Sequence, residues 1–324
     1  MSATLRSVGA VRVACAAMAL MVVAAGCGSL QKAPAGPPID ENLERLNRAA
    51  RLAFQKRQTE QAADLYRKAL ERAFVRGDLT AIVDARYNLA VCLMELGEYP
   101  QALDMIGQAL SELSRVGRNI QADFHLLEAT ILYRDGQLSR SWELTDTIIG
   151  SWMPQPPVIL SKTYFLRGLI AAAEGDAARL NEAIAKMGDA SDDSLRADRG
   201  ELMGRLAIIE GRWDQAIAAL DEAADLRRQI FAYRRMAIAL ALSAEACERA
   251  GRPGTAAGRY LQAGRSAALE GDASNAEKWL SSAVRLSEQS KDPSIAKEAR
   301  YHLALLAEKL EKARPDQQRP SGGR

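Results

Sequence analysis

Residues 87–110 read YNLAVCLMELGEYPQALDMIGQAL and contain one complete unit of a repeated pattern. An apolar helical run ends at Leu96-Gly97, and a second helical run begins at Tyr99 and continues through Ala102-Leu103 to Ala109-Leu110. Glycine can adopt the left-handed backbone conformation that ends a helix and turns the chain back. The stretch therefore predicts a helical hairpin, with small residues where the two helices approach each other.

The same pattern recurs along the chain at a nearly constant interval. The glycines that would end the first helix of each hairpin lie 39, 39, 36 and 40 residues apart, at Gly97, Gly136, Gly175, Gly211 and Gly251. The first unit lacks the glycine but keeps the pattern of its second helix, with Ala62, Tyr66, Ala69 and Leu70. A single hairpin cannot bury its apolar face alone, so repeated hairpins must stack on one another.

These units resemble the tetratricopeptide repeat, whose second helix carries a small residue, a bulky residue four positions later and Ala three after that. The resemblance covers residues 43 to about 270, and more weakly to 313, with a period similar to the extended repeats of the kinesin light chain type. It implies an all-α, right-handed superhelical solenoid of about seven hairpins over residues 41–313. The alternative is one compact globule with an unrelated arrangement of helices.

The amino terminus has the pattern of a bacterial lipoprotein signal. Residues 1–26 carry Arg6 and Arg12 and then a short apolar run, which is typical of a secretory signal and too short to span a membrane. Residues 23–27, VAAGC, resemble the lipobox and imply acylation of Cys27, although Ala24 stands where the family favours Leu. Acyl chains would anchor the protein to a membrane. The alternative is a signal anchor that stays uncleaved.

The segments on either side of the repeats differ from them in composition. Gly28 follows Cys27, where an Asp would imply retention in the inner membrane, so the expected location is the periplasmic face of the outer membrane. Residues 27–40 are rich in Pro, Gly and Ala and are expected to form a flexible tether. Residues 314–324 contain two prolines and two glycines and are expected to be disordered.

Composition excludes several classes of function. Removing the signal leaves 41 basic and 41 acidic residues, and a neutral protein has no electrostatic footprint for nucleic acid. Cys92 and Cys247 fall on helix faces that should be buried and lie too far apart to form a disulfide, so both are expected to be inert core thiols. The two histidines have no ligand partners at helical spacing, so no metal or other cofactor is expected.

Motifs of catalysis are also missing. The sequence contains no phosphate-binding glycine loop, no nucleophile elbow and no plausible Cys–His pair, so the protein is not expected to be an enzyme. Residues 150–157 form a proline-rich joint in which Trp152 either pins the loop to the core or marks a contact site. Residues 188–194 resemble an acidic cation loop superficially, but they lack the ligand pattern of an EF-hand and indicate a solvated loop with helix N-caps.

The resemblance also implies where a partner would bind. In tetratricopeptide arrays the first helices line the concave groove, and the inward positions of the first three units carry basic, amide and aromatic side chains that suit a peptide. The expected partner-binding residues are Arg48, Arg51, Tyr87, Asn88, Tyr133 and Arg134. Further inward positions hold Asn47, Phe54, Val91, Met94, Thr130, Arg205 and Glu245.

Two features limit that expectation. Arg51 and Asn88 match part of the family's carboxylate clamp, but its remaining cationic positions fall on Asp123 and Leu127, so the clamp itself is in doubt. The later repeats should present a blander surface that packs, with Ala171, Ala172, Ile209 and Ala241 near the corresponding turns.

The sequence therefore favours a membrane-anchored protein-interaction scaffold for envelope assembly. It is similar to tetratricopeptide lipoproteins that assist β-barrel insertion, assembly of the type IV pilus secretin or regulation of peptidoglycan synthases, and the sequence leaves these open. The expected partners are other envelope proteins, and the lipid anchor would bind the membrane. No nucleic acid or small-molecule substrate is expected. The alternative function is a ligand-binding lipoprotein for glycan or peptide uptake.

Overall fold

The computed structural model describes residues 40–115, 122–151, 154–188 and 192–313. The chain divides into two units, residues 1–41 and 42–324, and the second unit holds nearly all of the described residues. The predicted signal, Cys27, almost all of the tether, the tail after residue 313 and Trp152 lie outside the described residues.

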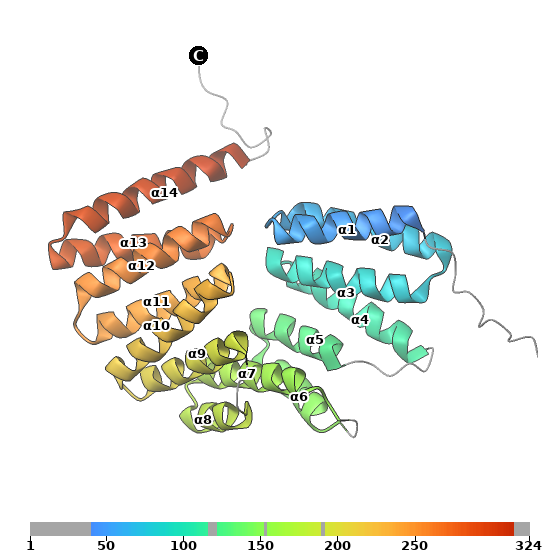
Figure 1. Cartoon of the computed structure of the whole chain (residues 1–324), viewed down its shortest axis with the longest axis horizontal. Helices are drawn as coiled ribbons and strands as arrows, with labels where there is room; N and C mark the ends of the chain where they lie inside the picture. The colour runs from blue at the N-terminus through green and yellow to red at the C-terminus, as the bar shows by residue number, and fades with distance from the viewer. Residues whose placement is uncertain (1–39, 116–121, 152–153, 189–191, 314–324) are drawn as a thin grey trace, which may run out of the picture. The chain divides into compact units, whose positions relative to one another are not determined.

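Within the described residues the chain is all-helical (Figure 1). The first seven helices are α1 Glu41–Gln55, α2 Thr59–Arg76, α3 Leu79–Leu96, α4 Tyr99–Arg115, α5 Ala122–Arg134, α6 Leu138–Ile149 and α7 Pro157–Glu174. The others are α8 Ala177–Lys186, α9 Asp193–Ile209, α10 Trp213–Gln229, α11 Tyr233–Arg249, α12 Pro253–Leu269, α13 Ala273–Ser290 and α14 Pro293–Ala313. Successive helices pack on each other as seven hairpins, which confirms the predicted solenoid.

The turn inside each hairpin contains one residue in the left-handed conformation. The five predicted glycines all have positive φ, between 71° at Gly211 and 80° at Gly97. The first hairpin uses Arg57 (φ 62°) and the last uses Lys291 (φ 59°) at the equivalent turn. The backbone therefore keeps the same turn where the sequence does not supply glycine, which explains why the first unit could be recognised without it.

Small residues lie where the helices touch, as the repeat pattern predicts. Ala102 and Ala216 are completely buried. A Cβ atom added to Gly168 would lie 2.4 Å from Leu202, and one added to Gly204 would lie 2.4 Å from Leu220. These distances are far below van der Waals contact, so only glycine fits unless the facing leucine moves.

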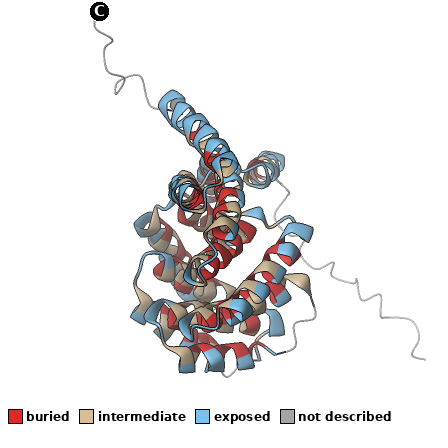
Figure 2. Ribbon diagram, turned by 90° about the vertical axis from the view of Figure 1, so that its left-hand side faces the viewer, coloured by how far each residue is buried: buried red, intermediate tan, exposed pale blue. Residues whose placement is uncertain are grey.

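Buried residues follow the facing sides of the helices, and exposed residues follow their outer sides (Figure 2). Cys92 and Cys247 are both buried and free, which confirms them as core thiols. Asp192 begins α9 as an N-cap, because its carboxylate accepts a hydrogen bond from the amide of Leu195 at 2.9 Å, as expected for that loop. No helix in the described part of the chain has the length and apolar character needed to cross a membrane.

Candidate partner-binding face

Two buried carboxylates on α9 form the centre of a charged network. Asp198 and Glu201 lie three residues apart, so they share one face of the helix. Lys162 of α7 lies 2.6 Å from Asp198, and Arg235 of α11 lies 3.1 Å from it. Arg205 binds Glu201 at 2.7 Å. First helices of three successive hairpins therefore contribute charges to one place.

Arg227 on α10 fills the interior of this network and is 1% exposed. Its guanidinium lies 2.6 Å from Glu201 and 3.2 Å from Asp198, and it donates a hydrogen bond to the carbonyl of Arg235 at 3.0 Å. A buried cation is tolerated only when charges and acceptors surround it. Arg227 therefore ties α9, α10 and the start of α11 together.

The cations keep the buried carboxylate ionised. Burial alone would raise the pKa of Glu201, but Arg205, Arg227 and Arg235 outweigh burial and hold that pKa well below its usual range. Glu201 is therefore ionised at neutral pH, and the network depends on its charge.

The network has more positive than negative groups. Its ion pairs join four cations to two carboxylates, and three of the cations keep part of their surface in solvent: Lys162 (34% exposed), Arg205 (21%) and Arg235 (39%). The guanidinium of Arg235 also stacks 4.7 Å above the ring of Phe165. Partly exposed cations beside an aromatic ring can bind an anionic group from outside.

Two of the predicted binding residues lie at the edge of this network. Burial raises the pKa of Tyr133, and the charges of Arg205, Glu201, Arg235 and Arg134 also act on its phenol, so these groups are close neighbours. We call the combined surface the inner charged face. It consists of Tyr133, Arg134, Lys162, Phe165, Asp198, Glu201, Arg205, Arg227 and Arg235.

The other four predicted residues have different surroundings. Tyr87 packs its ring against Phe124 with centroids 4.9 Å apart, and burial raises its pKa, so it is largely a packing residue between α3 and α5. The amide of Asn88 donates to the backbone carbonyl of Asp84 in its own helix. Arg48 and Arg51 are exposed on α1. None of the contacts found in the described residues joins these four to the inner charged face.

The sequence expectation missed most of the charged network. Ala171 and Ala241 are buried, as expected for packing positions of the later repeats. The expectation of a bland surface stays a prediction for those positions, but Lys162, Arg205 and Arg235 add partly exposed charges to the same three helices. One signal was available: Lys162 and Asp198 are 36 residues apart, and Asp198 and Arg235 are 37 apart, which is about one repeat.

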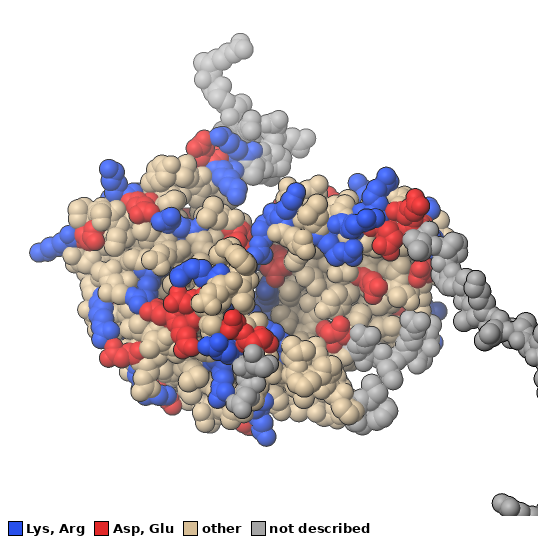
Figure 3. Space-filling model, viewed as in Figure 1, with Lys and Arg blue, Asp and Glu red and all other residues tan. Residues whose placement is uncertain are grey.

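Beside the inner charged face, ion pairs join hairpins that are distant in the sequence. Glu95 at the end of α3 binds both Arg134 of α5, at 2.8 Å, and Arg234 at the start of α11. Arg57 binds Glu270 at 2.7 Å. We call these contacts the central ion pairs. Figure 3 shows basic and acidic side chains gathered in the hollow where α3 and α5 face α11.

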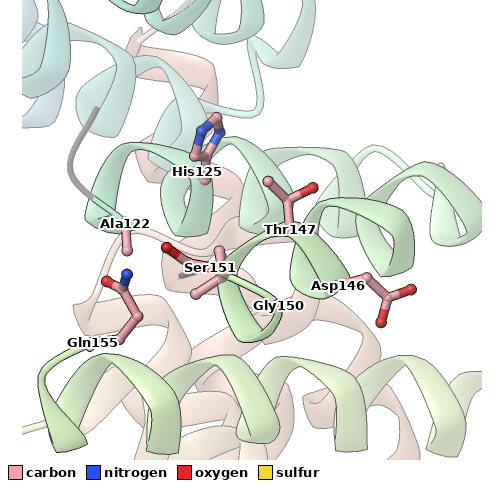
Figure 4. Close-up of a pocket in the computed structure, with 8 residues that line it drawn as sticks. Ala122, His125, Asp146, Thr147, Gly150, Ser151 and Gln155 are labelled. Carbon is pink, nitrogen blue, oxygen red and sulfur yellow. The ribbon is translucent and has the colours of Figure 1, made fainter. Parts of the chain in front are cut away.

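A separate cavity of about 460 Å³ lies between α5, α6 and the start of α7 (Figure 4). His125, Thr147, Ser151 and Gln155 line it, together with Asp146, whose side chain points away from the others in Figure 4 and pairs with Arg167. The described residues contain no group of three His, Cys, Asp or Glu side chains that could hold a metal ion. The cavity therefore offers no evident chemistry.

Comparison with known proteins supports the fold. No family model and no curated protein matches the chain. Among solved structures it is similar to a Rap protein complexed with Competence and Sporulation Factor, with 13% identity, 84% of this chain and 77% of that chain covered, and a TM-score of 0.56. It is also similar to the apo form of the quorum sensor NprR from B. thuringiensis, with 12% identity, coverage of 83% and 88%, and a TM-score of 0.53.

A tetratricopeptide repeat protein from Parabacteroides merdae also matches, with 13% identity, coverage of 80% and 99%, and a TM-score of 0.46. At these identities the likeness concerns the fold. The seven hairpins and the matches to the Rap protein and NprR show that the chain has a helical-repeat solenoid fold.

Proposed function

We propose that this protein is a protein-binding scaffold, held by a lipid on Cys27 at the periplasmic face of the outer membrane, and that its inner charged face binds an acidic segment of an envelope protein. The surplus of partly exposed cations around Asp198 and Glu201 carries the proposal. The lipid anchor and the location rest on residues 1–28 of the sequence alone.

The geometry of the face suits an acidic ligand. Arginine presents several donors in a planar fork that fits a carboxylate, and Arg205 and Arg235 each keep part of their side chain in solvent. Buried Arg227 fixes the helices that carry them, so little conformational entropy is lost when a ligand binds. The Rap protein of similar fold, which is complexed with Competence and Sporulation Factor, is a precedent for such an array with a bound partner.

The glycan-binding alternative has less support. Sugar recognition would be favoured by several stacked aromatic rings on one surface, but the ring of Phe165 already lies under Arg235, and Tyr133 is mostly covered. Protein binding is therefore the function that we propose.

The proposal can be tested by removing charge from the partly exposed side of the face. Lys162→Gln with Arg235→Gln removes two exposed positive charges, and amide donors remain near Asp198. The matched control is Arg285→Gln with Arg300→Gln, which removes the same charge from two exposed ion pairs on other helices. A partner captured from detergent-solubilised envelopes would be identified, purified and titrated against both variants.

We expect the first double variant to bind the purified partner at least tenfold more weakly, and the control to bind it like the wild type. Binding of the wild type should also weaken as salt rises, because exposed charges are screened. Equal affinity of the two double variants would contradict a role for the inner charged face.

The anchor has its own test. Cys27→Ala should prevent incorporation of labelled palmitate and leave an unacylated precursor, because the acylated thiol is missing. Processing and membrane fractionation like those of the wild type would refute the lipoprotein part of the proposal and leave the binding part intact.

A further inference from the structure

A cluster of apolar side chains is exposed where α10 turns into α11 and where α12 ends. Phe231 is 71% exposed and Leu269 is 83% exposed, and Ile230 and Tyr233 keep more than a third of their surface in solvent. We call these four residues the rim patch. Single exposed apolar residues are common, but a cluster of them on a folded protein marks a contact site more often than chance.

The two parts of the rim patch lie near each other because hydrogen bonds join the segments that carry them. The hydroxyl of Ser266 near the end of α12 donates to the carbonyl of Tyr233 at 3.3 Å. The guanidinium of Arg234 donates to the carbonyl of Glu270 at 3.5 Å. Leu269 therefore lies beside the turn that carries Phe231.

Phe231 has an unfavourable backbone as well as an exposed ring. Its φ is 58°, and the other left-handed residues between successive hairpins in the described chain are Gly77, Gly188 and Gly271. A bulky L-residue is strained in that conformation. Its ring meets Tyr233 only edge-on, with centroids 6.2 Å apart, so burial does not offset the strain. The amides of Phe231 and Ala232 close the end of α10 as those of Gly77 and Asp78 close the end of α2, so the turn explains the left-handed backbone but not the choice of an exposed Phe.

The charges around the rim patch indicate the chemistry of its occupant. Arg57 and Arg234 flank the patch and are partly exposed, whereas their partners Glu270 and Glu95 are largely covered. The patch therefore presents apolar side chains flanked by guanidinium groups, and the complementary surface is apolar with carboxylates beside it.

We propose that the rim patch binds a segment of another protein in which an apolar side chain is flanked by carboxylates, with Phe231 as the central contact. This binding point uses residues other than those of the inner charged face and does not rest on the function proposed for that face. It would give the scaffold a second contact with a partner.

The test uses the full chain and three fluorescein-labelled peptides. The first peptide has a Leu-Phe centre flanked by Asp and Glu, the second replaces the apolar centre by Ser, and the third replaces the acidic flanks by Lys. Phe231→Ala removes the ring, and Phe231→Gly removes the ring and the backbone strain. The matched control is Val75→Ala, because Val75 is a highly exposed apolar residue near the end of α2.

We expect the acidic apolar peptide to bind the wild type and Val75→Ala equally, and to bind both Phe231 variants at least tenfold more weakly by fluorescence anisotropy. The two other peptides should bind the wild type at least tenfold more weakly than the first. Phe231→Gly should unfold at the same or a higher urea concentration than the wild type, so its loss of binding cannot come from misfolding.

Three binding results would overturn the proposal: no measurable binding of the acidic apolar peptide, equal affinity of this peptide for the wild type and the Phe231 variants, or equal binding of the peptide with a Ser centre. A dimer in sedimentation that Phe231→Ala dissolves would also overturn it, since a second copy of the chain would then be the occupant. The Lys162→Gln/Arg235→Gln variant should bind the peptide like the wild type. Loss of binding only in that variant would place the peptide on the inner charged face, so this inference would fail while the proposed function stood.

Discussion

Glu201→Gln removes one negative charge from the centre of the inner charged face and changes the side-chain shape very little. In the wild type the carboxylate accepts hydrogen bonds from Arg205 at 2.7 and 2.9 Å and lies 2.6 Å from Arg227. The amide group of Gln would turn N–H donors toward guanidinium donors. Arg227, which has almost no contact with solvent, would keep only Asp198 as a charged partner.

The size of the effect follows from burial. Removing one partner of a buried ion pair costs about 3–5 kcal/mol, because the remaining charge is left uncompensated away from water. An exposed pair contributes only about 0–1 kcal/mol. Glu248→Gln, which breaks the exposed pair with Arg285 at 2.9 Å, is therefore the matched control. We expect the free energy of unfolding at neutral pH to fall by about 3 kcal/mol or more for Glu201→Gln.

The pH dependence provides a second check on the same carboxylate. Because folding lowers the pKa of Glu201, its ionised form contributes stability at pH values above its usual pKa of 4.5, and this contribution is lost as pH falls through the lower, folded pKa. The difference between wild type and Glu201→Gln should therefore be constant at neutral pH. It should shrink by up to about 1.4 kcal/mol for each pH unit below the usual pKa.

The measurement is urea denaturation followed by far-UV circular dichroism, repeated from neutral pH to acid. A loss of less than about 1 kcal/mol for Glu201→Gln, equal to that of Glu248→Gln, would refute the view that the buried charges hold α9, α10 and α11 together.

Three further outcomes are expected from the same structure. Gly204→Ala should be less stable than Gly200→Ala by about 1–3 kcal/mol in urea denaturation, because only a Cβ at position 204 would lie 2.4 Å from Leu220. Equal denaturation midpoints would contradict the close approach of the helices. Burial, and then the charge of Glu95, raises the pKa of Cys92 to about 12, so this thiol should resist alkylation in the folded protein at mildly alkaline pH. It should react after unfolding. Rapid labelling of the native protein, measured by mass spectrometry, would count against its burial. Lys291→Gly should raise the stability by up to about 1 kcal/mol in thermal denaturation. Glycine relieves a left-handed conformation that costs about 1–2 kcal/mol, but it loses more backbone entropy on folding. A clear loss of stability would show that the Lys side chain is needed there.

The repeat pattern predicted the hairpins because most of their turns are marked by a local sequence signal, a glycine. Gly97 and its four equivalents mark their turns without reference to any other part of the chain. Arg57 and Lys291 carry no such signal, although their backbone takes the same left-handed conformation. Phe231 could not be recognised either, because it too stands where glycine would mark the turn.

The charged network was harder to predict than the hairpins because sequence patterns treat Asp, Glu, Lys and Arg as exposed. Asp198 and Glu201 are buried only because Arg227 and Arg235 reach them from the next helices. The resemblance to tetratricopeptide repeats gave Tyr133 and Tyr87 the same binding role, but Tyr133 lies beside this network, whereas Tyr87 packs against a neighbouring repeat. The assignment of Arg48 and Arg51 to a binding surface stays a prediction.

The central ion pairs bear on how this chain can change in evolution. Repeat proteins commonly gain or lose whole repeats by duplication or deletion, since each repeat contacts only its neighbours. Here Glu95 binds Arg234 across 139 residues of sequence, and Arg57 binds Glu270 across a still longer separation. Inserting or deleting one hairpin between these partners would carry them out of register and separate Arg57, Glu270 and Arg234 from the partners they have here. The number of repeats between Arg57 and Glu270 is therefore under selection of its own, and homologous chains should vary in length outside this interval rather than within it.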